Sequence, residues 1–479
     1  MQKINFIYDD TIEVSDRAKT IIGKNSFGEM ILKRKKLYEY AQMASSEYVD
    51  GFYKIRNNND FRIINKLDEN DIYFHILSTA AILDSKEFEL ILQKSKFIKE
   101  TTAVVQGDTM ALIFPNRELY DIFLKKYLQN KVFNTVNVSN IINANCFSKI
   151  SDYNKLLMYI SSGFDARYFN SLQGDEFTIT KKSHDKKKMH MEYQYYWLLP
   201  DDMKNWMVMP FDYKEEKDFA SYSMERMPMT DIAIRWTHGA VTLEEMDKIL
   251  EKTFHFFNIR HQKEVSKEEF LKLSDSLYLN KLLDRVEKLK KCKEFPVMAA
   301  YISNGTDYES IDAIINDYVK IYKNCMKNYC KKAKTYKAVI GHGDVFFANM
   351  LYSKEINLLR LIDPKGAISE DELWSNPFYD IAKLSHSICG NYDFFNANLY
   401  DIYLDSDMKF KLNIDFDNTK YKNLFKNYLQ KNGLDYKMIR TFEASLFLSM
   451  LPLHIDNPHK VFGFLLNGIN IIKELKEYV

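Results

Sequence analysis

The sequence predicts an α+β protein built from more than one domain. Its 479 residues exceed the length of one ordinary domain. Over residues 1–145 predicted strands alternate with predicted helices, a pattern typical of α/β layers. Strand-like alternation returns before Pro228, and long helical patterns dominate from Thr242 onward. We therefore expect three segments, residues 1–145, 146–235 and 236–479.

Composition excludes several classes of protein. The hydrophobic fraction of 46% and the aromatic fraction of 14% are ample for packed cores. With 67 basic and 66 acidic residues, the chain has no global electrostatic reason to bind nucleic acid or an anionic membrane. The N-terminus has no apolar signal-peptide core, and no apolar run approaches a membrane span. Five cysteines without CxxC spacing predict a reduced, cytoplasmic chain without a zinc site.

The first segment, residues 1–145, alternates between the two kinds of element. The predicted elements are strands at Ile4–Tyr8 and Thr101–Val105, an extended run at Ile72–Leu83, and helices at Met30–Met43, Lys86–Ser95 and Arg117–Leu128. This segment resembles a degenerate sugar-phosphate nucleotidyltransferase, with Gln106-Gly107-Asp108 at a strand end as the best match. The glycine-rich loop that holds a nucleotide triphosphate in such enzymes is absent. We therefore expect an accessory domain, through which the chain could form a homodimer.

The next segment predicts a hairpin. Tyr168-Phe169 and Phe177–Lys181 are strand-like and flank the polar turn Asn170–Asp175. Because side chains alternate along a strand, Lys181 shares one face with Phe177, whereas Lys182 lies on the other.

Three further elements follow the hairpin. A predicted aromatic-rich helix, His190–Leu198, contains Glu192. The alternating stretch Asp218–Met227 predicts a strand that ends at Pro228. Thr242 predicts a helix N-terminus, because Glu245 follows it at capping-box spacing.

The most informative stretch runs from Val339 to Gly366. An apolar strand precedes His342-Gly343-Asp344, Asn349 follows five residues after that Asp, and the apolar run Leu358–Ile362 ends in Asp363. A carboxylate here can accept the proton of a hydroxyl, while Asn349 and Asp363 can supply oxygen ligands to Mg²⁺. The alternative is an ordinary polar turn followed by a strand-end cap. The full set of polar residues in this order favours phosphoryl transfer instead.

HGDxxxxN followed by an apolar strand and IDP resembles the catalytic and metal motifs of the aminoglycoside phosphotransferase and choline kinase superfamily, which is related to protein kinases. The resemblance covers roughly the last two thirds of the chain. It implies a bilobal fold, with a β-rich small lobe and a mainly helical large lobe, after the α/β N-terminal domain. It implies that Asp344 is the catalytic base, that His342 supports the loop, and that Asn349 and Asp363 bind Mg²⁺. Pro364 replaces the Phe of the protein-kinase Asp-Phe-Gly motif and should stiffen the metal loop.

The same resemblance assigns roles to other residues. Lys181 would pair with the nucleotide phosphates and with Glu192, although Lys182 remains an alternative. The hinge would present main-chain groups to adenine, at Met224, Glu225 and Met227. Asp380, in Asn376–Lys383, matches an Asp that anchors the catalytic loop. Polar side chains farther on are candidates for the acceptor pocket: His386, Asn391, Asp393, Glu443, His454 and Asp456.

The sequence thus predicts a cytoplasmic kinase that uses ATP and Mg²⁺ to phosphorylate a hydroxyl of a small metabolite. A sugar or an amino-alcohol is the expected acceptor, in the synthesis of capsule, other surface polysaccharide or phospholipid precursors. One alternative is a bifunctional enzyme whose N-terminal domain transfers a nucleotide. Another is a non-catalytic nucleotide-binding regulator, against which the intact Asp344, Asn349 and Asp363 argue.

Overall fold

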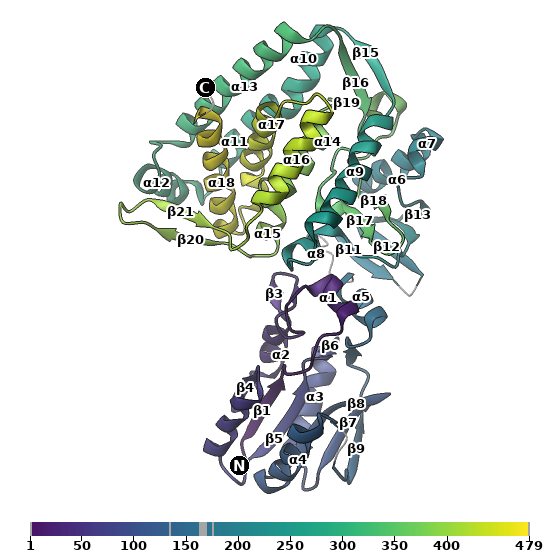
Figure 1. Ribbon diagram of the computed structural model, residues 1–479, viewed down its shortest axis with the longest axis vertical. Helices are drawn as coiled ribbons and strands as arrows, with labels where there is room; N and C mark the ends of the chain where they lie inside the picture. The colour runs from purple at the N-terminus through teal and green to yellow at the C-terminus, as the bar shows by residue number, and fades with distance from the viewer. Residues whose placement is uncertain (1, 134–135, 162–169, 175–176, 478–479) are drawn as a thin grey trace. The chain divides into compact units, whose positions relative to one another are not determined.

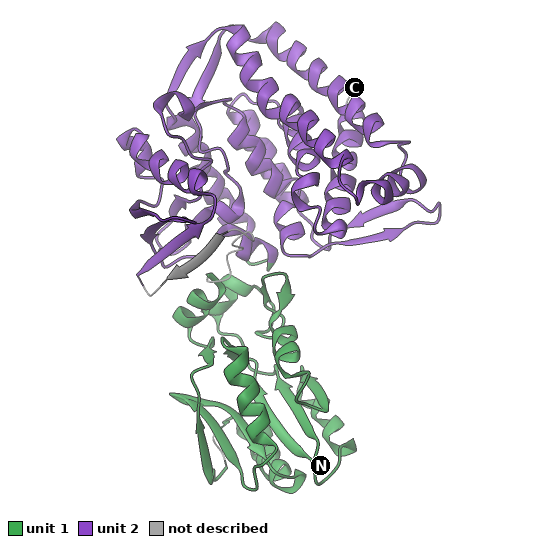
Figure 2. Ribbon diagram, turned by 180° about the vertical axis from the view of Figure 1, so that it is seen from behind, with its two compact units in different colours: residues 1–165, 238–240 green, residues 166–237, 241–479 purple. Residues whose placement is uncertain are grey.

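The computed structural model describes residues 2–133, 136–161, 170–174 and 177–477. The chain is a mixed α+β protein, as the sequence predicts (Figure 1). It divides into two compact units. Unit 1 comprises Met1–Asp165 with His238–Ala240, and unit 2 comprises Ala166–Thr237 with Val241–Val479 (Figure 2). The predicted hairpin strand Tyr168-Phe169 lies outside the described residues, as does part of the turn after it.

Unit 1 is built on a mixed six-stranded sheet. Its strands, in sheet order, are β4 (Gly51–Ile55), β1 (Ile4–Asp9), β5 (Ile72–Leu77), β8 (Asp108–Phe114), β7 (Thr102–Gln106) and β9 (Asn140–Asn143). β1 pairs in parallel with both β4 and β5, whereas β8 runs antiparallel to β5 and β7. The helices are α1 (Asp16–Ile22), α2 (Leu37–Ser45), α3 (Ser85–Ser95), α4 (Arg117–Asn130) and α5 (Tyr153–Ser161).

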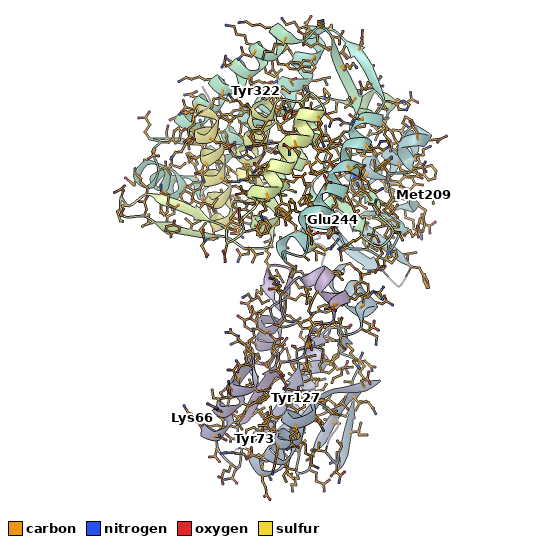
Figure 3. All side chains as sticks on the ribbon, in the orientation of Figure 1. Lys66, Tyr73, Tyr127, Met209, Glu244 and Tyr322 are labelled. Carbon is orange, nitrogen blue, oxygen red and sulfur yellow. The ribbon has the colours of Figure 1, made fainter. Side chains whose placement is uncertain are left out.

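Side-chain alternation in β1 separates two cores. Phe6 packs with Phe74 and with Phe88 of α3, while Ile7 belongs to the cluster that includes Tyr120 of α4. Successive strand residues point to opposite faces, so helices cover both faces of this sheet. Figure 3 shows side chains filling the unit, with Tyr73 and Tyr127 labelled in the α4-side core.

Two boundaries in unit 1 differ from the predicted ones. The helix predicted over Met30–Met43 begins only at Leu37, because Lys33 and Arg34 take positive φ angles and turn the hairpin of β2 (Ile31–Leu32) and β3 (Lys35–Lys36). The predicted change of domain at residue 146 also falls too early. β10 (Phe147–Lys149) pairs with β6 (Ala80–Ile82), which keeps this stretch in unit 1.

Unit 2 begins with an antiparallel sheet in the order β11 (Asn170–Gly174), β12 (Thr178–Ser183), β14 (Ala220–Glu225) and β13 (Pro210–Glu215). The helix α6 (Lys186–Leu198) packs against β13 and β14. The short helix α7 (Asp201–Lys204) connects α6 to β13.

The remainder of unit 2 is mainly helical. Its helices are α8 (Ile232–Thr237), α9 (Leu243–Ile259), α10 (Lys267–Asp275), α11 (Lys281–Lys290), α12 (Phe295–Gly305), α13 (Ile311–Lys332), α14 (Tyr379–Ile388), α15 (Tyr392–Asn396), α16 (Thr419–Lys431), α17 (Tyr436–Ser449) and α18 (Pro458–Glu477). Three of its strands form one sheet, in the order β15 (Gln262–Val265), β16 (Tyr336–Ile340) and β19 (Trp374–Ser375). Two hairpins complete the unit, β17 (Met350–Ser353) with β18 (Leu358–Leu361), and β20 (Asp401–Leu404) with β21 (Phe410–Asn413). One hydrophobic core joins α6 to these helices. None of the described helices is long and apolar enough to cross a membrane.

Candidate active site

The loop that follows β16 is held by Asp380 at the start of α14. The Asp380 carboxylate accepts hydrogen bonds from the main-chain N–H of His342 at 3.0 Å and from that of Gly343 at 2.7 Å. Gly343 has a φ of +83°, and a Cβ there would lie 2.5 Å from the Cβ of Lys365. A side chain at this turn would therefore be both strained and obstructed.

Asp380 also forms a buried ion pair. Arg260 Nη1 lies 3.0 Å from Asp380 Oδ2, and both side chains are at most 3% exposed. Arg260 also donates to the carbonyl of Pro377, just before α14. These bonds use the lone pairs and protons that burial would otherwise leave unsatisfied, which fixes the loop relative to α9 and α14.

Asp344 faces a cation from the same helix. Lys383 Nζ lies 2.8 Å from Asp344 Oδ1, and the Asp344 side chain is 27% exposed. Burial lowers the pKa of Lys383, but the charge of Asp344 outweighs it, so the pKa rises and the lysine stays protonated. The sequence motif contains Lys383, but we predicted no role for it. Its position one turn after Asp380 on α14 was the available signal.

His342 lies beneath the loop and is fully buried. Its Nδ1 accepts the main-chain N–H of Asp344 at 3.3 Å. Burial lowers the pKa of His342 and outweighs the charges of Asp380 and Asp344, so the ring is neutral. A neutral ring can accept this hydrogen bond, as a support for the loop requires.

The residues before and after Asp363 join its loop to the loop that contains His342 and Asn349. The N–H of Ile362 donates to the carbonyl of Asn349 at 3.1 Å, and that of Lys365 donates to the carbonyl of His342 at 2.9 Å. Asp363 itself has a φ of +55°, which is uncommon for a residue with a side chain. Such conformations persist only where the surrounding structure holds them in place, and they concentrate at functional sites.

The oxygen atoms of Asn349 and Asp363 fit the demands of Mg²⁺. The Asn349 amide nitrogen donates to the carbonyl of Asp344 at 3.0 Å, so its oxygen is the atom that would face a cation. The Asp363 side chain is 38% exposed. Among the described residues, no group of three or more His, Cys, Asp or Glu could hold a metal ion. Mg²⁺ is the ion that binds with one or two protein ligands, water and substrate phosphates.

Lys181 forms ion pairs with two carboxylates. Its Nζ lies 2.6 Å from Glu192 Oε2 of α6 and 2.9 Å from Asp363 Oδ1. Burial lowers the pKa of Lys181, but the charges of Asp363 and Glu192 raise it above its ordinary value. Lys182 instead lies over the ring of Phe219, on the other face of β12. The structure thus brings Lys181, and not Lys182, to Asp363.

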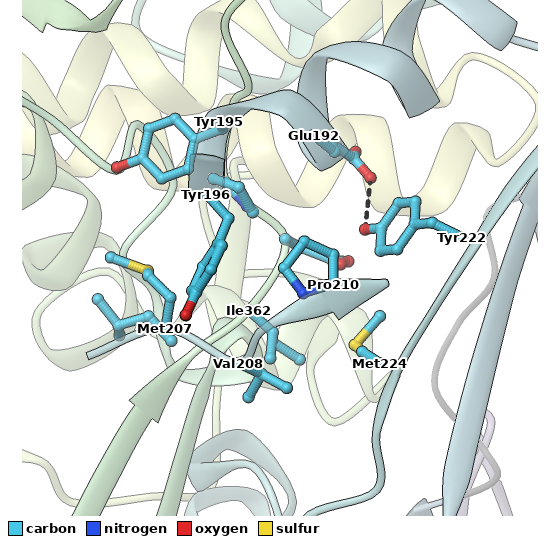
Figure 4. A pocket seen from close by; sticks show the side chains of 12 residues that line it. Glu192, Tyr195, Tyr196, Met207, Val208, Pro210, Tyr222, Met224 and Ile362 are labelled. Carbon is cyan, nitrogen blue, oxygen red and sulfur yellow. Dashed lines mark hydrogen bonds between the residues drawn. The ribbon is translucent and has the colours of Figure 1, made fainter. Parts of the chain in front are cut away.

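A small pocket adjoins this ion-pair network (Figure 4). Tyr222, opposite Lys181 in the sheet, donates to Glu192 Oε2 at 3.1 Å. The pocket is lined by Glu192, Tyr195, Tyr196, Met207, Val208, Pro210, Tyr222, Met224, Leu361, Ile362, Asp363 and Pro364. Its lining is apolar except near the ion pairs, a combination typical of ligand pockets. Sequence reasoning missed Tyr222, although the alternation of β14 was the available signal.

The predicted hinge residues occupy two environments. Met224 pairs with Ile179 on one side and with Pro210 on the other, so its main chain lies inside the sheet. The prediction that its main chain meets an adenine edge is therefore wrong, and its side chain lines the pocket instead. Glu225 and Met227 lie where the strand ends, outside the centre of the sheet.

Three of the six candidate acceptor residues are buried. His386 stacks on Tyr392 at a ring distance of 4.2 Å, and burial holds its pKa well below the ordinary value. Glu443 pairs with Arg440 at 2.5 Å and accepts a hydrogen bond from Ser385. Glu443, predicted as a candidate to line the acceptor pocket, is thus a buried residue whose carboxylate has partners within the fold. Asp393 is the third, at 2% exposure.

The other three candidates, Asn391, His454 and Asp456, are not fully buried. Asn391 accepts a hydrogen bond from Asn418 Nδ2 at 2.8 Å. The ring of His454 meets the edge of Phe464, whereas Asp456 is exposed. Ring contacts connect two of the six, since Phe464, which His454 meets, stacks on Tyr392, and Tyr392 stacks on His386.

The stability of the fold should depend on pH through the buried carboxyl of Asp393. Burial raises its pKa to about 7, and also raises that of Asp231, on which the charge of Asp393 acts. The pKa of Asp393 is higher in the folded than in the unfolded protein, so protonation of this carboxyl stabilises the fold. This contribution to the free energy of unfolding is fully present below about pH 4 and is lost as pH rises towards 7. As pH rises from 5 to 8, the free energy of unfolding of Asp393→Asn should increase by roughly 3 kcal/mol relative to that of the wild type.

Urea unfolding at both pH values tests this prediction. The exposed Asp456→Asn is the matched control, and its difference from the wild type should not change with pH. An equal stability difference for Asp393→Asn at pH 5 and pH 8 would show that its carboxyl ionises freely in the fold.

Comparison with known proteins gives structural neighbours only. No protein-family model matches the chain. No curated protein matches it in sequence. Among solved structures, a thermostable mutant of aminoglycoside phosphotransferase APH(4)-Ia in its apo form is 9% identical, with a TM-score of 0.34, and the match covers 64% of this chain and 94% of that one.

Two further neighbours are structures of the same protein. A ternary complex of a thermostable mutant with ADP and hygromycin B is 9% identical, with a TM-score of 0.35, and the match covers 67% of this chain and 98% of that one. A structure of APH(4)-Ia is 8% identical, with a TM-score of 0.33 and coverage of 66% and 97%. These neighbours belong to the family that the HGDxxxxN motif resembles.

Proposed function

We propose that this protein is a phosphotransferase that uses ATP and Mg²⁺ to phosphorylate a hydroxyl of a small metabolite. One observation carries the proposal. Lys181 forms ion pairs with both Glu192 and Asp363. Main-chain hydrogen bonds join the loop of Asp363 to Asn349 and to the turn that contains Asp344. A cation, two oxygen ligands and a carboxylate base are the groups that phosphoryl transfer needs.

Asp344 has the base role in this mechanism. Its carboxylate orients the acceptor hydroxyl and takes its proton as the oxygen attacks the γ-phosphorus. Lys383 balances the charge of Asp344 at 2.8 Å before the acceptor arrives. Asp380 holds the turn through two main-chain N–H groups, so the base does not have to be ordered at the moment of reaction.

The nucleotide side uses Lys181 and the metal loop. Lys181 would move from Asp363 to the nucleotide phosphates while Glu192 keeps it in place. Asn349 and Asp363 would hold Mg²⁺, which neutralises phosphate charge when it is bound. Glu225 and Met227 would offer main-chain groups to the adenine edge.

This function assigns two lobes to unit 2. The sheet of β11–β14 with α6 would be the small lobe, and α9–α18 the large lobe. Unit 1 would be an accessory domain, and a homodimer through it is one arrangement that we propose.

Within the described residues of unit 1, the polar side chains at the end of β1 have partners in the fold. At the end of β1, Asp9 pairs with His75 at 3.1 Å, and Asp10 accepts hydrogen bonds from Ser26 Oγ at 2.6 Å and from the N–H of Gly28 at 2.8 Å. The nucleotidyltransferase-like match, Gln106-Gly107-Asp108, is the tight turn of the hairpin between β7 and β8, where Gly107 takes a positive φ. These polar groups are used within the fold.

A turnover assay over a panel of hydroxyl compounds tests the proposal. The full chain is incubated with ATP, Mg²⁺ and each compound, and ADP formation is measured beside a thermal-shift scan of the same mixtures. A genuine acceptor should raise the unfolding midpoint and the rate of ADP formation together. Stabilisation by ATP and Mg²⁺ without ADP formation for any compound would favour the non-catalytic regulator.

A further inference from the structure

A groove lies between α13 and the stretch formed by α10 and the turn that follows it, on helices labelled in Figure 1. Its volume is about 390 Å³, which is within the range of ligand-binding clefts in proteins. Phe270 of α10 stacks on Tyr329 of α13 at a ring distance of 5.3 Å, and Tyr322 of α13 donates to Asp275 Oδ1 at 2.7 Å. These contacts fix the two walls of the groove relative to each other.

The floor of the groove is apolar and includes an irregular helical turn. After α10 the chain makes one π-helical turn, Ser276–Asn280, a conformation that is rare and is often found at functional sites. Leu279 of this turn, Leu271 of α10 and Met326 of α13 line the groove. Met326 is 5% exposed and the two leucines are half-buried, so the apolar side chains are recessed.

Four exposed lysines line the same groove. Lys323, Lys327 and Lys331 follow one another at intervals of four residues on α13, so they extend along one side of the helix over about 12 Å. Lys267 lies on the α10 side. Within the described residues, the side chains of these four lysines form no ion pair and no hydrogen bond. Asp275 is the one carboxylate among the described lining residues, and a tyrosine hydroxyl already donates to it.

The charges along the α13 wall are of one sign. Residues 320–332 include five lysines and no acidic residue. Like charges four residues apart on a helix repel each other, and a carboxylate between them removes this repulsion. Lys320, outside the groove, has such a partner in Asp317 at 3.7 Å. An anionic partner would supply the missing carboxylates at the groove, and a row of cations along one cleft also steers such a partner towards it.

A protein segment fits this groove better than a nucleic acid or a membrane surface. The recessed floor needs a partner with projecting apolar side chains, which the phosphate backbone of a nucleic acid does not offer. A bilayer is bound by apolar side chains that enter it, whereas Met326 lies below exposed lysines. An amphipathic helix has an apolar stripe beside charged residues and binds in hydrophobic grooves.

We propose that this groove binds an acidic amphipathic helix of a partner protein. The apolar stripe of that helix packs on Leu271, Leu279 and Met326, and its carboxylates, spaced four residues apart, pair with the lysines of α13. Ion pairs at an exposed rim contribute little affinity, so the apolar floor supplies most of the binding and the lysines select the sign of the partner's charge. The groove lies apart from the residues around Lys181 and Asp344, so this inference does not depend on the proposed function.

Fluorescence anisotropy with the full chain and three synthetic peptides tests this inference. The probe is a helix of about 18 residues, with leucines at i, i+3, i+4 and i+7 spacing and glutamates on both sides of the leucine stripe. One control peptide has lysine in place of every glutamate, and the other has the composition of the probe in scrambled order. The probe should bind at least roughly 10-fold more tightly than either control.

Lys327→Glu and Lys332→Glu are the matched variants. Lys327 lies at the centre of the lysine row, whereas Lys332 is exposed on the same helix but does not line the groove. Lys327→Glu should weaken binding of the probe by roughly 10-fold, because an attraction becomes a repulsion, and Lys332→Glu should change it by less than about twofold.

Four outcomes overturn the inference. The first two are equal binding of the probe and the scrambled peptide, and equal losses in the two variants. The third is displacement of the probe by phosphatidylglycerol vesicles or by an oligonucleotide, which would assign the lysines to a membrane or to a nucleic acid. The fourth is self-association of the full chain that Lys327→Glu abolishes, which would assign the groove to a second copy of this chain.

Discussion

Asp344→Asn should lower the rate of phosphoryl transfer by roughly two or more orders of magnitude, the range expected when a positioned general base is lost. The amide keeps the size and the hydrogen-bonding shape of the carboxylate but cannot take a proton from the acceptor. The fold should persist, because the turn is held by Asp380 and His342 rather than by the charge of Asp344.

Rapid-quench measurement of ADP formation at saturating ATP and Mg²⁺ tests this expectation. Asp363→Asn is the matched comparison, since it removes one charge from the neighbouring loop and should weaken binding of ATP with Mg²⁺. Asp344→Asn should leave that binding intact. A rate close to that of the wild type would show that Asp344 is not the base, and a variant that does not fold would make the turn primarily structural.

Asp380→Ala should destabilise the fold by about 3–5 kcal/mol, because it leaves the Arg260 guanidinium buried without its carboxylate. It also removes the acceptor for the N–H groups of His342 and Gly343. The catalytic turn should loosen, so the folded fraction should have lost most of its activity.

Glu245→Ala separates these two effects. Glu245 forms an equally buried pair with Arg235, between α8 and α9. Its removal should cost a similar amount of stability, read from urea unfolding curves, but should preserve turnover per folded molecule. If Asp380→Ala also preserves turnover per folded molecule, Asp380 does not position the catalytic loop. Asp380→Asn provides the same comparison if the alanine variant does not fold.

Local patterns allowed several parts of the site to be predicted from the sequence. Alternation in β12 placed Lys181 and Lys182 on opposite faces, with Lys181 preferred and Lys182 as the alternative partner of Glu192, and the structure pairs Lys181 with Glu192. The capping signal at Thr242 likewise marks the start of α9, where the Thr242 hydroxyl accepts the N–H of Glu245. Each of these features depends on residues that are close in sequence.

Contacts between distant segments could not be predicted in this way. Arg260 and Asp380 lie 120 residues apart, and Lys281 and Tyr379 lie 98 residues apart. No periodic pattern connects such pairs. The contact of Lys281 with Tyr379 therefore becomes visible only when α11 and α14 are packed together.

Burial of polar residues misled the choice of acceptor contacts. His386 and Glu443 are polar, so in the sequence they are indistinguishable from residues that face a substrate. In the fold, His386 stacks on an aromatic ring and Glu443 is neutralised by Arg440. The hinge prediction failed at Met224 for a related reason, because the two neighbouring strands of its sheet could not be assigned from β14 alone.

Calorimetric titration of ATP, with Mg²⁺ and with EDTA, tests the central claim most directly. The wild type should bind ATP with Mg²⁺ and should bind much more weakly in EDTA. Lys181→Met should weaken binding roughly 10- to 100-fold, the value of a lost hydrogen bond to a charged group, whereas Lys182→Met should bind like the wild type. Equal binding in EDTA, no binding in either condition, or equal losses in the two lysine variants would contradict a metal-bound nucleotide held by Lys181, Asn349 and Asp363.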